Sequence, residues 1–242
     1  MNTVRSANPR STSTWTAIVS LLQGLLIFVP LIVLGAAIEW PASLDDPAAI
    51  ALPRLLEEES VVRFGYIAYL IYSILFAITM TMLVKLVNGN AMRNLMSLIL
   101  GFAIISTLAR SLGIIRWLDP MPQLAESWDL ATTDQERFAI SVNFDVLNSY
   151  GGSIGEVLGV SIFAAISILL FSIAAIKDRS LPTWLSGFGL ISGVSVLATA
   201  ITLTGADAGD FLITFGTSMV QFWFLAMGIW LLYWSRKTSQ IG

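Results

Sequence analysis

The chain has 242 residues, of which 56% are hydrophobic and only 12% are charged, and its formal net charge is −3. A soluble domain carries about twice that share of charged residues, so the composition predicts a membrane protein rather than one or two soluble domains. Cysteine and histidine are both absent, which excludes disulfides, thiolate nucleophiles, histidine-ligated metals and any Ser-His or Cys-His catalytic pair.

Six apolar stretches are each long enough to cross a bilayer as a helix, which takes about 20 residues. In chain order they cover residues 15–38, 64–87, 95–117, 147–176, 181–204 and 211–234. The sequence therefore predicts an all-α fold, a single bundle of six transmembrane helices over 15–235 with short tails at 1–14 and 236–242. We expect no span to be interrupted at mid-depth, because Pro30 lies near the outer end of the first one.

Basic residues gather in the two tails and in alternate connections between the stretches. They are Arg5, Arg10, Lys85, Arg93, Lys177, Arg179, Arg236 and Lys237. Because Lys and Arg are enriched on the cytoplasmic side of membrane proteins, we expect both termini to be cytoplasmic in a multi-pass protein of a bacterial cytoplasmic (inner) membrane. The remaining connections hold most of the acidic residues and only a few basic ones.

The longer outer connections cover residues 39–63 and 118–146. In the second of these, Thr133 followed by Glu136 matches a capping box. This pattern predicts a helix that begins at Thr133 and leads toward the fourth segment, and we expect it to form a short surface helix over the outer end of the bundle.

One catalytic signature occurs in the first outer connection. Glu58, Glu59 and Arg63 reproduce the Glu-Glu-x-x-x-Arg pattern of the intramembrane CAAX-prenyl-protease-like family. That family resembles a metal-dependent enzyme with histidines on later helices, and this chain has none. We therefore interpret the acidic run as a solvated loop, predict no catalytic or metal-binding residue, and favour a protein that is not an enzyme.

Two opposite charges lie inside the apolar segments, Arg110 in the third and Glu156 in the fourth. An ionised side chain at this depth is costly, so it normally faces the bundle interior and finds a partner. The helical rise of ~1.5 Å per residue places both at a similar depth below the outer surface, which predicts a buried Arg110–Glu156 ion pair. Arg116 lies near the interface and is expected to extend to water. Whether the pair only fixes the packing or also forms a ligand site is left open.

Further polar residues extend this candidate site, namely Gln221 in the last segment and Tyr66 and Tyr69 in the second. Small residues at a spacing of four allow helix backbones to approach closely. The expected packing positions are Gly151, Gly155, Gly159, Gly189 and Gly193.

Several stretches resemble an uncharacterised bacterial family of six-helix membrane proteins, catalogued as a domain of unknown function. The stretches are 62–66, which lead into the second segment, 108–110 in the third, and 179–189 before the fifth. The family has a similar Phe-Arg-x-Gly entry, a charged residue in its third helix and a Leu-Pro-x-x-Leu-Gly turn. The resemblance covers about Trp15 to Tyr233 and implies a fold without a reaction.

These observations favour a non-catalytic membrane protein, either an accessory, partner-binding subunit of a larger membrane complex or a small-ligand sensor. The alternative is a small-molecule or ion-coupled transporter that uses Arg110, Glu156 and Gln221. The expected partners are the lipid bilayer and other membrane protein subunits; nucleic acid is not expected, since the chain has no basic stripe. No cofactor is predicted, and a bound lipid, quinone or pigment stays an open alternative because these need not leave a motif.

Overall fold

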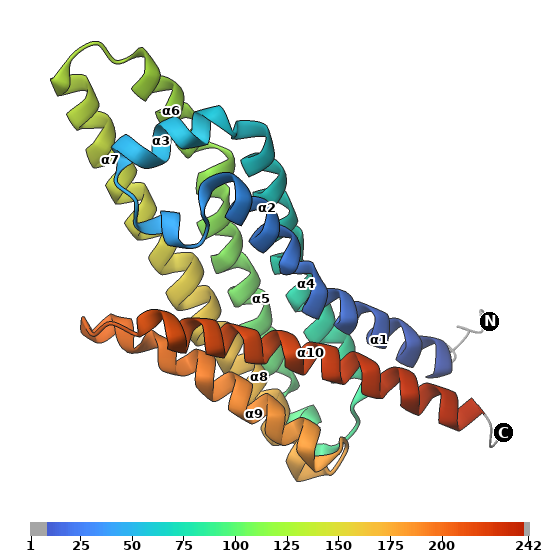
Figure 1. Ribbon diagram of the computed structural model, residues 1–242. Coiled ribbons are helices and arrows are strands. Elements are labelled where there is room, and N and C mark those ends of the chain that lie inside the picture. The colour runs from blue at the N-terminus through green and yellow to red at the C-terminus, as the bar shows by residue number, and fades with distance from the viewer. Residues whose placement is uncertain (1–8, 240–242) are drawn as a thin grey trace, which may run out of the picture.

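The computed structural model describes residues 9–239, which are helical throughout with short connections and contain no strand (Figure 1). Six helical units within these residues are long and apolar enough to cross a membrane. They are Ser13–Ile38, Glu59–Leu86, Asn90–Leu130, Asp134–Asp178, Thr183–Thr204 and Phe211–Arg236. The predicted all-α fold with six spans is confirmed. Residues 1–8 and 240–242, which belong to the predicted tails and include Arg5, lie outside the described residues.

The first span is broken at Ile27, between α1 (Pro9–Leu26) and α2 (Phe28–Ile38). Pro30 explains the break, because proline lacks the N–H that would bond to the carbonyl of Leu26 and its ring clashes with that carbonyl. The break is a kink near the middle of the span, because Ile27 keeps helical backbone angles (φ −61°, ψ −28°) and accepts a hydrogen bond from the backbone nitrogen of Leu31. Residues 13–38 therefore form one kinked span, and none of the six described spans is interrupted, as expected. On either side of the kink, α1 packs against α10 (Gly209–Ser239) while α2 packs against α4 (Glu59–Leu86).

Short helices cover one end of the bundle, which is the outer end in the predicted orientation. After the 3₁₀ turn η1 (Ala42–Asp45), helix α3 (Ala48–Glu57) packs against α6 (Pro120–Leu130) and α7 (Asp134–Gly152), as Figure 1 shows. The acidic run expected to be a loop is instead a helix junction, where α3 ends at Glu57 and α4 begins at Glu59. Glu57 and Glu58 are exposed there.

The third span, α5 (Asn90–Leu118), begins at a cap that comes from a distant part of the chain. The carboxylate of Asp178, at the end of α8 (Ala165–Asp178), accepts hydrogen bonds from the backbone nitrogens of Ala91 at 2.9 Å and Met92 at 2.7 Å. These donors have no partner within their own helix, so Asp178 stabilises the start of α5 and joins it to the end of the fourth span.

The fourth span combines α7, a π-helical stretch η2 (Ser153–Ala164) and α8 without interruption. The capping box forms as predicted: the backbone nitrogen of Glu136 donates to Thr133 Oγ1 at 3.2 Å, and the backbone nitrogen of Thr133 donates to Glu136 Oε2 at 2.9 Å. The helix that begins here is therefore the start of the fourth span itself, well before residue 147. In a π-helix the hydrogen bonds run from i to i+5, and such stretches often mark functional sites.

The last two spans are α9 (Thr183–Ala198), which ends in the 3₁₀ turn η3 (Thr199–Thr204), and α10. Helix α10 packs against both α9 and α1. Its contact with α1 is close, because a Cβ added at Gly24 would lie 2.9 Å from the Gln221 carbonyl oxygen, and one at Gly228 would lie 2.9 Å from that of Ala17. The start of α1 and the end of α10 lie at the same side of the molecule (Figure 1).

Two separate clusters of buried apolar residues form the core. The larger one joins α4, α5, α8, α9 and α10 around Phe76, Phe171 and Trp223. The smaller one joins α2, α3, α4, α5, α6 and α7 around Leu52 and Trp117, at the end that carries the short helices. The bundle is therefore packed in two parts, and the candidate site lies where they meet.

Candidate functional site

A cavity of about 550 Å³ lies between the two apolar clusters, with walls from α2, α4, α5, η2 and α10. This volume falls within the range of small-molecule sites. All five residues that the sequence proposed as a candidate site line it, although they come from four different spans. They are Tyr66, Tyr69, Arg110, Glu156 and Gln221.

The α4 wall is built from tyrosines at a spacing of three residues, which places them on one helix face. Tyr66 stacks on Trp117, with ring centroids 5.3 Å apart and an interplanar angle of 2°. Tyr69 lies between Trp40 and Tyr72, at centroid distances of 5.5 Å and 6.0 Å. Aromatic pairs in such arrangements stabilise each other beyond simple burial, so the wall is a rigid aromatic surface.

Arg110 lies on α5 and is only 4% exposed. Its Nη2 donates to the carbonyl oxygen of Ser73 at 3.1 Å, and its Cζ lies 4.8 Å from the ring centroid of Phe76 and 5.5 Å from that of Tyr72. Among the described side chains, those of residues 13–209 and 211–236, no carboxylate lies within 4.0 Å of it, and its Nε has no hydrogen-bond partner. The predicted ion pair between Arg110 and Glu156 is therefore wrong.

Glu156 pairs with Arg116 instead, with 3.5 Å between Arg116 Nη2 and Glu156 Oε1. The Arg116 side chain is 7% exposed, so the expectation that it extends to water at the interface is also wrong. The Glu156 side chain is 56% exposed and lines the cavity. The Glu156 carboxylate therefore contacts Arg116 and also borders the open space of the cavity.

The register between α5 and η2 explains the change of partner. A Cβ at Gly159 would lie 3.1 Å from the backbone nitrogen of Arg110, and one at Gly151 would lie 2.7 Å from Arg116 Cδ. Gly159 is therefore level with Arg110, and Glu156 lies nearer the outer end, within reach of Arg116.

The backbones of α5 and η2 come closest at Gly113 and Gly155. A Cβ at Gly113 would lie 2.8 Å from Gly155 Cα, and one at Gly155 would lie 3.1 Å from Gly113 Cα. Just below, Ser106 Oγ donates to the Gly159 carbonyl oxygen at 2.7 Å. The small residues therefore bring the two charged helices together and place their long side chains beside the cavity.

The other expected packing glycines lie on α9. A Cβ at Gly189 would collide with the Ser172 side chain and lie 2.8 Å from Trp223 Nε1, and one at Gly193 would lie 2.6 Å from Leu169 Cγ. Both positions are therefore too close to neighbouring spans for a larger side chain.

A polar stripe on α10 forms the opposite wall. Thr214 is exposed, Thr217 and Ser218 are partly buried and Gln221 is buried, and all four line the cavity. Gln221 Nε2 donates to the hydroxyl of Tyr72 at 2.7 Å, while its Oε1 has no partner. The stripe therefore runs from the surface to the interior along one helix.

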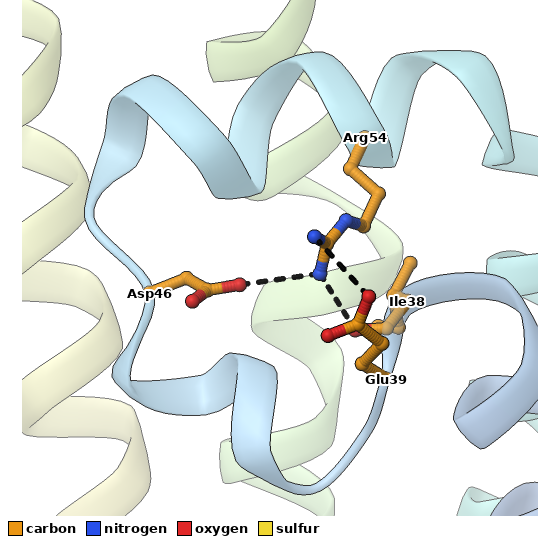
Figure 2. A network of polar contacts seen from close by, with 4 residues as sticks. All are labelled: Ile38, Glu39, Asp46 and Arg54. Atoms are coloured by element: carbon orange, nitrogen blue, oxygen red, sulfur yellow. Dashed lines mark hydrogen bonds and ion pairs between the residues drawn. The ribbon is translucent and has the colours of Figure 1, made fainter.

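A strap of residues 39–47 lies over the outer part of the cavity, to which it contributes Trp40, Pro41 and Leu44. Arg54 of α3 holds both ends of this strap (Figure 2). Its Nη1 donates to the Ile38 carbonyl and to Asp46 Oδ2, each at 3.2 Å, and its Nη2 lies 3.6 Å from Glu39 Oε1. On the far side, Asn148 Nδ2 of α7 donates to the Leu44 carbonyl oxygen at 2.7 Å.

The sequence prediction missed three parts of the site, namely Tyr72, the role of Arg116 and the strap. Tyr72 continues the spacing of Tyr66 and Tyr69, so the tyrosine repeat was a usable signal. Arg116 packs against Gly151. The pair Gly151 and Gly152 in the fourth span could have indicated that a long side chain of a neighbouring helix lies there. The strap depends on hydrogen bonds between positions far apart in the chain and has no local signature.

Several buried polar atoms of the cavity wall have no hydrogen-bond partner. They are Tyr66 Oη, Arg110 Nε, Arg116 Nε and Nη1, and Gln221 Oε1. Buried polar groups nearly always have partners in native proteins, either from the chain, from water or from a ligand. The wall of the cavity therefore contains polar atoms that are buried without a partner, which is unusual in a packed interior.

Fold and site together define a multi-pass helical membrane protein with a charged cavity inside its bundle. Residues 14–234 match the model of a family described as a domain of unknown function, DUF4386, and the chain belongs to this family. The expected membership in an uncharacterised family is thereby confirmed. No curated protein and no solved structure matches the chain.

Proposed function

We propose that this protein is a small-molecule carrier that binds its ligand in the cavity inside the bundle. The observation that carries the proposal is the convergence of Arg110, Glu156 and Gln221, from three separate spans, on one open space. Charged residues inside membrane bundles are costly and as a rule mark the path of a ligand or an ion. A structural latch would instead bury its charges against each other and leave no space between them.

The two irregular helices support this proposal. The break at Ile27 and the π-helical stretch η2 both contribute to the cavity wall. Proline kinks and π-helical stretches leave some backbone groups without their regular partners, and π-helical stretches often lie at functional sites.

The proposal keeps the orientation that the Lys and Arg distribution predicts, with both termini cytoplasmic in a bacterial inner membrane and the strap on the outer side. The other hypothesis from the sequence, an accessory subunit of a larger complex, stays a prediction. The cavity favours the carrier, because binding a protein partner does not need polar groups around an internal space.

The test is thermal unfolding of the purified protein in lipid nanodiscs with a panel of octyl compounds: octanoate, octyl phosphate, octanol and octyltrimethylammonium. A ligand that binds the folded state raises its unfolding temperature. The variant Thr217→Trp fills the cavity, and it is mild because Thr217 bonds only carbonyls of its own helix, Ile213 and Thr214. Phe215→Trp, at an exposed position on the same helix, is the matched control.

We expect at least one compound of the panel to raise the unfolding temperature of the native protein and of Phe215→Trp, but not that of Thr217→Trp. The proposal is overturned if no compound stabilises the protein, or if stabilisation is the same in the filled variant.

A further inference from the structure

We infer that the ligand of this cavity is an amphiphile with one anionic head group, whose oxyanion binds Arg110. This inference rests on the proposed function and adds to it the chemical class of the ligand. It depends on the charge balance of the cavity, on the donors that Arg110 leaves available, and on the apolar surface below it.

The charge balance favours an anion. The described charged residues that line the cavity are Arg110, Arg116 and Glu156. Glu156 compensates Arg116, to which it is paired at 3.5 Å, so Arg110 has no counter-ion among the side chains that the structure describes, those of residues 13–209 and 211–236. A buried charge without a partner strongly destabilises the folded state, and an oxyanion beside it removes that penalty.

The geometry of Arg110 leaves room for such a partner. Ser73 accepts from only one of its terminal nitrogens, and the rings of Tyr72 and Phe76 hold the guanidinium plane in position. Nε has no partner. A guanidinium presents its donors in a planar fork that matches a carboxylate or a phosphate, so an arginine held in place beside the cavity, with one carbonyl bonded to its terminal nitrogens, suits an oxyanion.

Part of the cavity wall, apart from the polar stripe of α10, is apolar. Ala164, Ile168, Val196 and Val220 line the cavity at its inner end, from four different elements. Together with the tyrosine wall they offer an alkyl or aryl group a surface without charges, whereas a small hydrated anion would gain nothing from it. A charged head with an apolar body therefore fits better than inorganic phosphate.

The octyl panel separates this inference from the proposed function. We expect octanoate or octyl phosphate to raise the unfolding temperature, and octanol and octyltrimethylammonium to leave it unchanged. Arg110→Gln should weaken the binding of the octyl anion by roughly tenfold or more, whereas Arg93→Gln, at an exposed position of the same helix, should not. If octanol stabilises the protein as well as octanoate does, and only Thr217→Trp abolishes the effect, the proposed carrier function is supported. The inference that the ligand is an anion is then overturned.

Nanodisc composition distinguishes a free anion from a lipid head group. If the ligand is an anionic phospholipid, phosphatidylglycerol discs should stabilise the native protein over phosphatidylcholine discs, and Arg110→Gln should remove the difference. If it is a free amphiphile, octanoate should stabilise the protein equally in both. An Arg110-dependent effect in either arm supports the inference, and its absence in both overturns it.

A measurement that leaves the native charges in place covers the case in which Arg110→Gln does not fold. The chain has no cysteine, so Ser218→Cys provides a single thiol on the cavity wall. We expect it to react roughly tenfold faster with the anionic sulfonatoethyl methanethiosulfonate than with the cationic trimethylammonioethyl reagent, after division by the rates at Asn88→Cys, an exposed position. Equal rates, or a faster cation, would overturn the inference.

Discussion

Gln221 of α10 donates a 2.7 Å hydrogen bond to the hydroxyl of Tyr72 on α4, and this bond joins opposite walls of the cavity. Both side chains are buried. Tyr72→Phe removes the acceptor and leaves the amide of Gln221 without a partner, which should lower the free energy of unfolding by about 1–3 kcal/mol. Denaturant unfolding in detergent measures the change. Tyr233→Phe, at an exposed position, should have no comparable effect.

The corrected ion pair predicts a specific energetic coupling. In a double-mutant cycle, Glu156→Gln and Arg116→Gln should show a coupling energy of about 0.5–1 kcal/mol. The coupling is modest because the Glu156 side chain is 56% exposed. The same cycle between Glu156 and Arg110 should give a smaller value, since the two are not paired. A larger coupling with Arg110 would restore the pairing that the sequence suggested.

The close approach of α5 to η2 predicts that replacing glycine by alanine changes the stability differently at two positions of α5, Gly113 and Gly101. Gly113→Ala should destabilise the protein by about 1–3 kcal/mol, because the new Cβ would lie 2.8 Å from Gly155 Cα and the backbones would have to separate. Gly101→Ala, on the same helix with nothing within 4 Å of the new Cβ, should be neutral or stabilise by up to about 1 kcal/mol. Unfolding temperatures of the two variants that move in the same direction would contradict this packing.

The orientation can be tested with single cysteines in a chain that otherwise has none. Ser127 on α6 and Asn88 between α4 and α5 are both exposed, at opposite ends of the bundle. A membrane-impermeant maleimide should label Ser127→Cys in intact cells, and it should label Asn88→Cys only after the membrane is permeabilised. The reverse pattern would place both termini outside.

The six spans could be predicted because the bilayer imposes a simple requirement on composition and length. The candidate site was predictable for a related reason. Polar side chains such as Arg110, Glu156 and Gln221 are rare inside spans and face the interior of the bundle. Because these three lie at similar depths, facing the interior brings them to the same cavity.

The details of the site could not be predicted, because they depend on helix irregularities and on long-range contacts. The depth of Glu156 was estimated from a helix that begins at residue 147, whereas the helix begins at Asp134 and contains a π-helical stretch. The break at Ile27 lies three residues before Pro30, further into the span than the proline itself. The cap that Asp178 provides for α5 joins positions more than 80 residues apart.

A density map of the protein in nanodiscs, determined by electron cryomicroscopy with saturating octanoate, would show whether the cavity holds an anion at Arg110. We expect an elongated density inside the cavity with its head at the Arg110 guanidinium, while Glu156 stays beside Arg116. A collapsed cavity, or a map in which Arg110 and Glu156 face each other with no space between them, would contradict the account.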